Sequence, residues 1–270
     1  MIHSTAIVAP GARLGANVRI GPYAIVGPDV TVGDDVEIAG HALLDGRLVL
    51  GARVRVGHGA VVGAEPQDLK FKADTPSGVR VGAGTVIREY VTIHRATRPE
   101  AWTEIGEDCL LMAMCHVAHD CRIGDGVIVI NYAGITGHCE IGDRATVGGY
   151  AGIVPFTRVG TFAYIGGCAK INQDVPPFMM ADGNLATVRG VNVVGLRRAG
   201  VGLADRRALR EAHRLLYRSG LSPAGALERM RRELDPTPRV KELIAFVEGA
   251  KRGILGPPAS AADVEAEAQD

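Results

Sequence analysis

Aliphatic residues recur at every sixth position along most of this chain. The first unbroken run of these positions contains Ile2, Val8, Leu14, Ile20, Val26, Val32, Ile38, Leu44, Leu50, Val56 and Val62. A small or aliphatic residue stands four positions after each of these residues. Glycine often stands directly after them, as at Gly15 and Gly21. An α-helix has a period of about 3.6 residues and a strand a period of about 2, so neither produces this pattern.

A period of six residues predicts a parallel β-helix, in which each hexapeptide forms a short strand and a turn. Three hexapeptides complete one triangular coil, and successive coils stack about 4.8 Å apart. The first residue of each repeat then points inward, while glycine serves turns or close contacts between backbones. The repeats that run to Ile171 amount to roughly nine coils. We therefore expect a mainly β fold around one continuous aliphatic core.

Two interruptions and one change of pattern divide the chain. The repeat pauses over residues 64–80, which we interpret as an inserted loop, and Pro99 breaks one step in a shorter excursion. After residue 178 the spacing becomes helical, over residues 204–220, 222–234 and 240–254. The predicted domains are a β-helix at 1–189, a small α-helical domain at 190–255 and a disordered tail at 256–270.

Charge and composition narrow the possible functions. Lys and Arg together number 30, as do Asp and Glu, and this neutral balance argues against nucleic-acid binding through bulk charge. The chain lacks the basic leader of a signal peptide and any apolar run of about 18 residues, so we expect a cytoplasmic protein without a transmembrane segment. Four cysteines occupy the small fifth slot of their repeats and are interpreted as buried hydrophobic residues in a reducing compartment. They are Cys109, Cys115, Cys121 and Cys139.

Polar residues suited to catalysis lie on the repeats between residues 109 and 141. Because one coil contains about 18 residues, His119 should lie under Gly137 and Asp120 under His138. His116 is close by, so three histidines and a carboxylate are expected on one rigid wall. A histidine there can act as a general base, and Gly137 can offer a bare backbone N–H to an oxyanion. Three histidines also suit zinc, which leaves a metal site as an alternative.

The predicted helices carry a cluster of arginines within an otherwise neutral chain. Its members are Arg197, Arg198, Arg206, Arg207, Arg210, Arg214 and Arg218. The cluster predicts a surface that binds an acidic carrier protein, and the alternative is a solvated basic helix face.

Short motifs outside the periodic positions occur in a fixed order along nearly the whole chain. In the first half they are IGPYAIVGPDVTVG near the start, QDLK at 67–70, IREYVTIHRAT at 87–97, HVAHDC at 116–121 and GH at 137–138. Further along they are QDVPPF at 173–178, GN at 183–184, GVN at 190–192, GLRR at 195–198 and LLYRSG at 215–220. Together these motifs resemble the UDP-N-acetylglucosamine O-acyltransferases that start lipid A synthesis. They are far more specific than the hexapeptide repeat, which many acyltransferases share.

The resemblance implies a left-handed coil, an exception to the right-handed crossover rule, and a homotrimer with active sites between subunits. It implies that an acyl carrier protein thioester donates a hydroxyacyl chain to the 3-hydroxyl of a UDP-glucosamine-type sugar. His119, Asp120 and Gly137 would form the catalytic group. His119 would be the general base, Asp120 would orient it, and the Gly137 N–H would hold the oxyanion. No cofactor and no metal are expected.

The resemblance also extends to substrate-binding positions. The residues that match them are Gln67, Asp68, Lys70, His116, His138, Asn192, Arg198 and Gly167. The first five would hold the sugar and the acyl hydroxyl, and the next two would face the nucleotide. The glycine, in the stretch YIGGCAK, matches the position that gates the far end of the acyl groove. Because glycine has no side chain, we expect a preference for longer acyl chains.

The chain departs from the family pattern at several polar positions. Val154 and Pro155 stand where His-Gln is usual, Leu185 replaces a His, Val194 replaces a Glu near the uracil, and Ala199 replaces an Arg. Each change removes a polar contact to the substrate, so a diamino sugar nucleotide stays open as the acceptor. The alternative function is another hexapeptide-repeat acyl- or acetyltransferase that acts on a sugar amine or uses coenzyme A.

Overall fold

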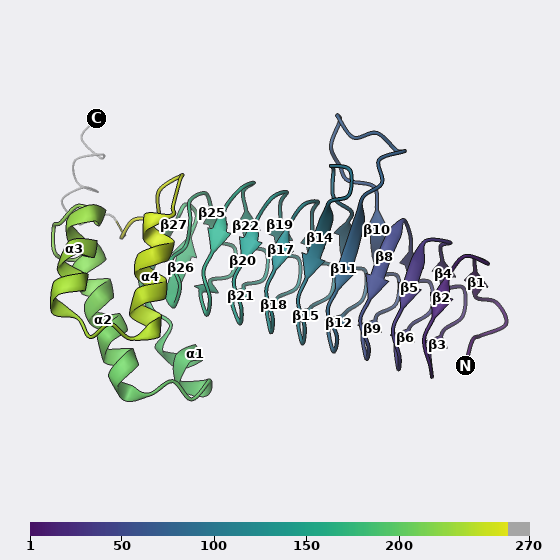
Figure 1. Cartoon of the computed structure of the whole chain (residues 1–270), viewed down its shortest axis with the longest axis horizontal. Coiled ribbons are helices and arrows are strands. Elements are labelled where there is room, and N and C mark those ends of the chain that lie inside the picture. The colour runs from purple at the N-terminus through teal and green to yellow at the C-terminus, as the bar shows by residue number, and fades with distance from the viewer. Residues whose placement is uncertain (259–270) are drawn as a thin grey trace.

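The computed structural model describes residues 1–258 and shows a long prism wound from three sheets of short parallel strands (Figure 1). Each turn of the chain adds one strand to each sheet, so neighbouring strands from β1 to β25 are three apart in chain order. The coil is left-handed, and helices follow it. This confirms the predicted fold class, a left-handed parallel β-helix with α-helices at the C-terminal end.

Sheet I has nine strands and carries the residues of interest for catalysis. Its strands are β1 (Ile7–Val8), β4 (Ile25–Val26), β7 (Leu43–Leu44), β10 (Val61–Ala64), β13 (Thr92–His94), β16 (His116–Val117), β19 (Gly134–Ile135), β22 (Gly152–Ile153) and β25 (Lys170–Ile171). Sheet II contains β2 (Arg13–Leu14), β5 (Val30–Val32), β8 (Arg47–Leu50), β11 (Gly78–Val81), β14 (Trp102–Ile105), β17 (Arg122–Ile123), β20 (Glu140–Ile141) and β23 (Arg158–Val159).

Sheet III is extended at its C-terminal end by an antiparallel hairpin of β26 and β27. Its strands are β3 (Arg19–Ile20), β6 (Glu37–Ile38), β9 (Arg55–Val56), β12 (Val86–Ile87), β15 (Leu110–Leu111), β18 (Ile128–Val129), β21 (Thr146–Val147), β24 (Tyr164–Ile165), β26 (Met179–Gly183) and β27 (Ala186–Val191).

The first residue of each hexapeptide points into the prism, as the periodicity predicts. In sheet I, Val117 pairs with Ile135, and Ile135 pairs with Ile153, so partners are 18 residues apart. All three side chains are at most 1% exposed. Burial of each such side chain contributes roughly 1.5–3 kcal/mol to folding. The stacked rungs therefore form a rigid wall that fixes the position of any side chain on its outer surface.

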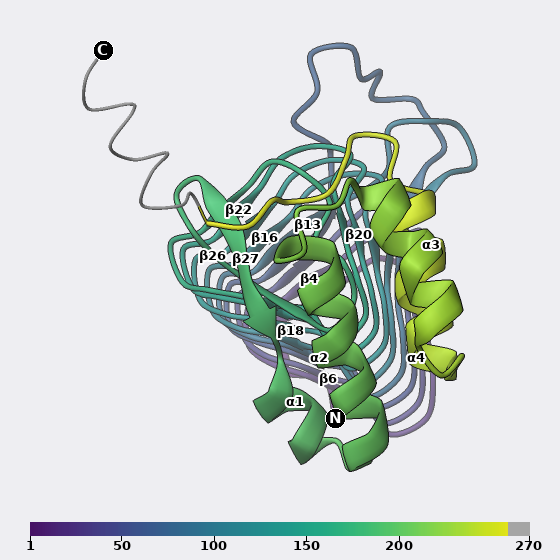
Figure 2. The same ribbon diagram turned by 90° about the vertical axis from the view of Figure 1, so that its left-hand side faces the viewer.

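The inserted segment and the shorter excursion leave the prism between consecutive rungs. The insertion falls between β10 and β11, and the excursion, residues 95–101, falls between β13 and β14. The two are tied together, because Ser77 Oγ donates to the Ala96 carbonyl at 2.5 Å and Glu100 N donates to the Pro76 carbonyl at 2.9 Å. They project as one body from a single edge of the prism (Figure 2).

Four helices follow the last coils: α1 (Val193–Arg198), α2 (Leu203–Tyr217), α3 (Pro223–Glu233) and α4 (Pro238–Glu248). Helix α2 lies across the C-terminal end of the prism, and α3 and α4 stand beside it (Figure 2). Helices α3 and α4 begin with proline after the capping residues Ser222 and Thr237. The short α1 is absent from the sequence-based expectation, and the third predicted helix stops early because Gly249 caps it.

The β-helix and the helices share one buried core. That core runs from Val18 to Leu255 without a break between the two parts. Asp174 forms a β-bridge with Ile254, which ties the end of the chain back to the prism. The division into domains at residue 190 therefore stays a prediction. Most of the predicted tail, residues 259–270, lies outside the described residues. Within residues 1–258, no helix has the length and apolar character to cross a membrane.

Candidate active site

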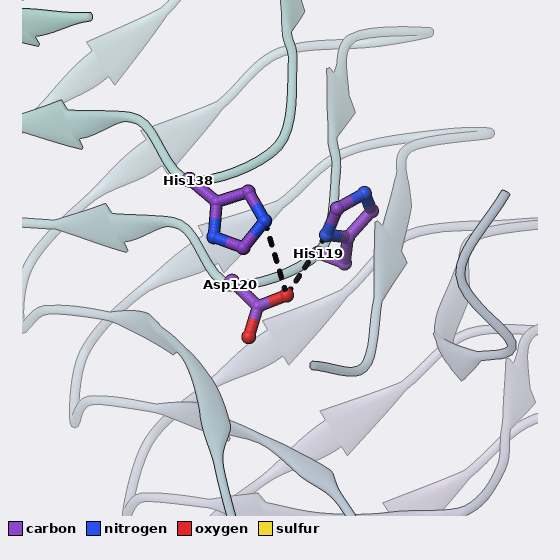
Figure 3. Close-up of side chains that lie close together, drawn as sticks. All are labelled: His119, Asp120 and His138. Carbon is purple, nitrogen blue, oxygen red and sulfur yellow. Dashed lines mark hydrogen bonds and ion pairs between the residues drawn. The ribbon is translucent and has the colours of Figure 1, made fainter. Parts of the chain in front are cut away.

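The corner that follows β16 brings the predicted base and its carboxylate together. The Nδ1 atom of His119 lies 2.8 Å from Oδ2 of Asp120, and Figure 3 marks this interaction with a dashed line. The carboxylate side chain is only 4% exposed and the imidazole 15%. Asp120 has a positive φ of 59°, a conformation set by the left-handed corner. The corner thus turns the carboxylate of Asp120 back onto the ring of the residue before it.

Hydrogen bonds to Asp120 determine which nitrogen of His119 is free. Burial alone would raise the pKa of Asp120, but hydrogen bonds from His119 and Thr97 outweigh it and lower that pKa to about 2. At neutral pH Asp120 is therefore a carboxylate that only accepts hydrogen bonds. His119 must donate through Nδ1–H, which leaves the lone pair on Nε2. That nitrogen can accept a proton from a substrate hydroxyl.

Gly137 lies directly against the free edge of this imidazole. A Cβ atom built on Gly137 would lie 2.5 Å from Cε1 and 2.7 Å from Nε2 of His119. No side chain larger than hydrogen fits there without moving the ring. Within residues 1–258, the Gly137 N–H donates to no protein acceptor. A free N–H donor therefore lies beside a free proton acceptor.

His138 stands on the other side of Asp120. Its Nε2 atom is 3.9 Å from the same Oδ2, and the two atoms are joined by a dashed line in Figure 3. The ring of His138 stacks on Phe156 with centroids 4.5 Å apart. Burial lowers the pKa of His138, the charge of Asp120 raises it, and the former prevails. His138 is thus largely neutral near pH 7 and is able to hydrogen-bond a sugar or acyl hydroxyl.

A second pair of histidines lies on the outer surface of sheet I. His116 Nδ1 is 2.7 Å from Thr92 Oγ1, and its ring meets His94 edge-on with centroids 4.7 Å apart. Burial lowers the pKa of both, to about 4 for His94, with a further contribution from His119. His94 is 6% exposed, and its Nδ1 has no partner in the described part of the chain.

The inserted loop places Asp68 near this cluster. The Asp68 carboxylate accepts the backbone N–H of Lys70 at 2.9 Å and is close enough to raise the pKa of His138. Gln67 and Lys70 are exposed, and Leu69 between them is fully exposed. The loop therefore presents polar side chains on the side of the prism where His119 lies.

Three predicted residues do not join the cluster within one chain. Gly167 lies at the corner that follows β24, a different edge of the prism from the corner of His119. Asn192 caps α1, accepting from Gly195 N and donating to the Phe162 carbonyl, both at 2.9 Å. Arg198 is exposed at the end of α1. Their contacts with substrate therefore stay predictions.

The alternative of a metal centre has a geometric basis. One ligand atom from each of His119, Asp120 and His138 lies within 4.8 Å of the other two. The oxygen that faces both histidines already accepts hydrogen bonds from the Thr97 N–H, the Thr97 hydroxyl and His119. A metal ion would have to displace them, so the donor set fits an imidazole–carboxylate pair better than a metal centre.

Sequence reasoning missed the residues that support the carboxylate and line the wall. They are His94, Thr97, Thr103 and Phe156. The excursion lengthens one coil, so Ile93 pairs with Val117 across 24 residues rather than 18. An 18-residue rule therefore cannot place Thr97 beside Asp120. If the residues from Ile93 to Val117 are counted as one lengthened coil, the sequence does place Thr97 near Asp120.

Comparisons with known proteins agree with this geometry. A profile described as bacterial transferase hexapeptide (six repeats) matches residues 11–46 and 103–137. Another, described as Udp N-acetylglucosamine O-acyltransferase, domain 2, matches residues 174–255. The fold and the repeats thus define a hexapeptide-repeat acyltransferase.

The similarity to individual proteins extends over nearly the whole chain. A Paraburkholderia phytofirmans acyl-[acyl-carrier-protein]–UDP-N-acetylglucosamine O-acyltransferase is 47% identical over 260 residues, 94% of this chain and 98% of its own. The LpxA structure from Acinetobacter baumannii aligns with a TM-score of 0.90 at 39% identity, covering 94% of this chain and 99% of that one. The LpxA structure from Bacteroides fragilis aligns with a TM-score of 0.92 at 36% identity, covering 94% of this chain and 100% of that one. This chain belongs to the UDP-N-acetylglucosamine O-acyltransferase family and is an O-acyltransferase.

Proposed function

We propose that this enzyme transfers a hydroxyacyl chain from acyl carrier protein to the 3-hydroxyl of UDP-N-acetylglucosamine, in lipid A synthesis, with His119 as general base. The observation that carries the proposal is the pairing of His119 Nδ1 with the Asp120 carboxylate at 2.8 Å, with Nε2 beside Gly137. The names of relatives at up to 49% identity over 94% of the chain support both substrates.

The proposed reaction needs one proton acceptor and one oxyanion donor. His119 Nε2 takes the proton of the sugar 3-hydroxyl, and the oxygen attacks the thioester carbonyl carbon. The negative charge on the carbonyl oxygen is stabilised by the Gly137 N–H. When the C–S bond breaks, the imidazolium returns the proton to the carrier thiolate. Asp120 stays ionised throughout, because its pKa is about 2.

A homotrimer with shared sites is the second part of the proposal. The outer face of sheet III is apolar in its middle rungs, where Val86, Leu110 and Ile128 point outward and are half-buried in one chain. At the adjoining corner, Tyr132 and Tyr150 stack with centroids 4.7 Å apart and are 47% and 64% exposed. An exposed apolar face of this kind supports self-association. It would bring α1 of one chain toward the His119 cluster of the next.

The exposed arginines of α2 support binding of an acidic carrier protein. Arg207, Arg210, Arg214 and Arg218 form one exposed row along the helix. Within α2, Arg214 is the one member of this row that forms an ion pair, with Glu211 at 2.6 Å. Cytoplasmic location is also proposed, and the five unpaired cysteines, all within the described residues, support a reducing compartment.

The test is an acyl-transfer assay with purified protein, 3-hydroxyacyl carrier protein and UDP-N-acetylglucosamine. Transfer to oxygen gives an ester that mild alkali hydrolyses, whereas transfer to an amine gives an amide that survives. Parallel reactions with acyl-coenzyme A and with a 3-amino sugar nucleotide test the alternatives left open by Leu185 and Val194, which are 59% and 51% exposed. An alkali-stable product or a preference for coenzyme A would refute the proposal.

A further inference from the structure

The carboxylate of Asp120 faces two histidines with one oxygen. Its Oδ2 atom lies 2.8 Å from His119 Nδ1 and 3.9 Å from His138 Nε2 (Figure 3). Its other oxygen is buried and has no partner in the described part of the chain. A small rotation of the carboxylate would therefore exchange His119 for His138. Something outside the three residues must hold the carboxylate in the productive orientation.

Thr97 makes two hydrogen bonds to that same oxygen. Its hydroxyl donates to Oδ2 of Asp120 at 2.7 Å, and its backbone N–H donates at 3.1 Å. The backbone of Asp120 is held separately, because its N–H donates to Thr103 Oγ1 at 2.9 Å. Two donors on one oxygen restrict rotation of the carboxylate, and hydrogen bonds to a charged group are stronger than neutral ones.

Thr97 is itself fixed through the two projecting segments. Arg95 N donates to the Ala64 carbonyl at 3.0 Å, and the Ala96 carbonyl accepts the Ser77 hydroxyl at 2.5 Å. The two residues before Thr97 are thus tied to the inserted segment or to the strand that precedes it. The support of Asp120 depends on the same body that carries Asp68 and Lys70.

We propose that Thr97 is a positioning residue for acyl transfer, holding Oδ2 of Asp120 on His119 so that Nε2 of His119 remains the proton acceptor. The inference rests on the proposed role of His119 and Asp120. Thr97 acts through Asp120 and contacts no reacting atom. It therefore sets the rate of proton transfer and leaves substrate affinity unchanged.

The test compares Thr97→Val, which removes the hydroxyl donor at nearly constant volume, with Thr97→Ser, which keeps it. Thr97→Val should lower kcat about tenfold with KM changed less than about twofold, and Thr97→Ser should stay within about twofold of the parent. Thr31→Val is a matched control, since Thr31 is an outward strand residue on β5, at the far end of the prism. It should leave both constants unchanged. Thermal melts establish that each variant is folded.

A double-mutant cycle separates this inference from the proposed function on which it rests. Asp120→Ala should lower kcat about 100-fold, and Thr97→Val should add nothing in that background. An unaffected Asp120→Ala enzyme would overturn the role of the pair itself. Undiminished kcat in Thr97→Val, or an equal loss with and without Asp120, would overturn the positioning role alone. If Thr97→Val does not fold, Thr97→Ala takes its place in the same cycle.

Discussion

At the scale of single residues, the left-handed corners determine where chemistry can occur. The fourth slot of a repeat usually has positive φ even without glycine, as at Asp120 (59°) and His138 (63°). Glycine is instead needed at the second slot, where the backbones of neighbouring coils lie close together. A Cβ atom on Gly15 would lie 2.7 Å from the Gly33 carbonyl carbon. Side chains at the corners therefore turn outward and touch those of neighbouring coils, which is how His119, Asp120 and His138 meet.

The role of His119 is tested by His119→Ala. Loss of a general base should lower kcat about 100- to 10,000-fold, while the fold persists because the flanking Val117 and Cys121 stay buried. His58→Ala is the matched control, since His58 occupies the same third slot of its repeat and is exposed. Steady-state kinetics and thermal melts measure both effects. Activity within a few fold of the parent would remove His119 from the chemical step.

His94 links burial to the pH dependence of stability. Its pKa is about 4 in the folded chain, below the ordinary value of 6.5, because burial disfavours the imidazolium. Neutral His94 therefore stabilises the fold fully above pH 6.5, and this contribution, on the order of 3 kcal/mol, is lost as pH falls toward 4.

The variant His94→Gln cannot titrate, so its urea midpoint should fall less than that of the parent between pH 7 and pH 5. Burial also lowers the pKa of His116 and His213, so part of the fall should remain. Denaturation at several pH values measures the difference. Parallel curves for parent and variant would show that His94 does not protonate on unfolding.

At the scale of elements, the six-residue period was sufficient to predict the strands, their 18-residue register and the buried positions. It could also place His119 under Gly137, because both lie on uninterrupted coils. It could not place Thr97, since the excursion adds residues to one coil. Nor could it predict α1, whose six residues are too few for a periodic signal and depend on the cap at Asn192.

Helix α2 is where the arginine cluster can be tested. The structure removes Arg206 from the exposed part of this cluster, because the residue is half-buried and its Nε has no acceptor in the described part of the chain. Reversal of the exposed pair, Arg207→Glu with Arg210→Glu, should raise KM for the carrier thioester about tenfold at low salt. The effect should shrink as salt screens the interaction. An unchanged KM at low salt would exclude the carrier from this face.

Gly167 is tested by substitution at the corner after β24. A Cβ there would lie 3.3 Å from the Gly149 carbonyl oxygen, which is tight but leaves the rest of a side chain pointing outward. Gly167→Met should therefore fill space beyond the prism and shift preference toward shorter acyl donors. Each CH₂ denied burial costs about 0.8 kcal/mol. Competition between donors of different length measures the shift, and an unchanged profile would make Gly167 a simple corner glycine.

At the scale of the whole molecule, the predicted site residues lie in two separate places within one chain. The base, its carboxylate and the loop with Asp68 gather on one edge of the prism. The predicted nucleotide residues lie at opposite ends of α1, with Asn192 as its N-cap and Arg198 as its last residue. Helix α1 itself follows the last coils of the prism (Figure 1). The outer face of sheet III is apolar in its middle rungs, whereas that of sheet II is charged where Arg122 and Glu140 pair in register. In the proposed trimer, another copy would therefore cover sheet III. The proposed site between chains would bring the two places together, and it makes a prediction that a site within one chain does not.

That prediction concerns trimers mixed from two inactive variants, His119→Ala and Arg198→Ala. If His119 of one chain works with Arg198 of another, mixed trimers contain sites in which both residues are intact. Dissociating and reassembling equal amounts of the two proteins should then restore transfer to a measurable fraction of the parent activity, while each variant alone stays inactive. If both residues serve the same site from one chain, every site lacks one of them and mixing restores nothing. Size-exclusion chromatography coupled to light scattering shows whether the mixture has reassembled, so a negative result with trimers present would refute the shared site.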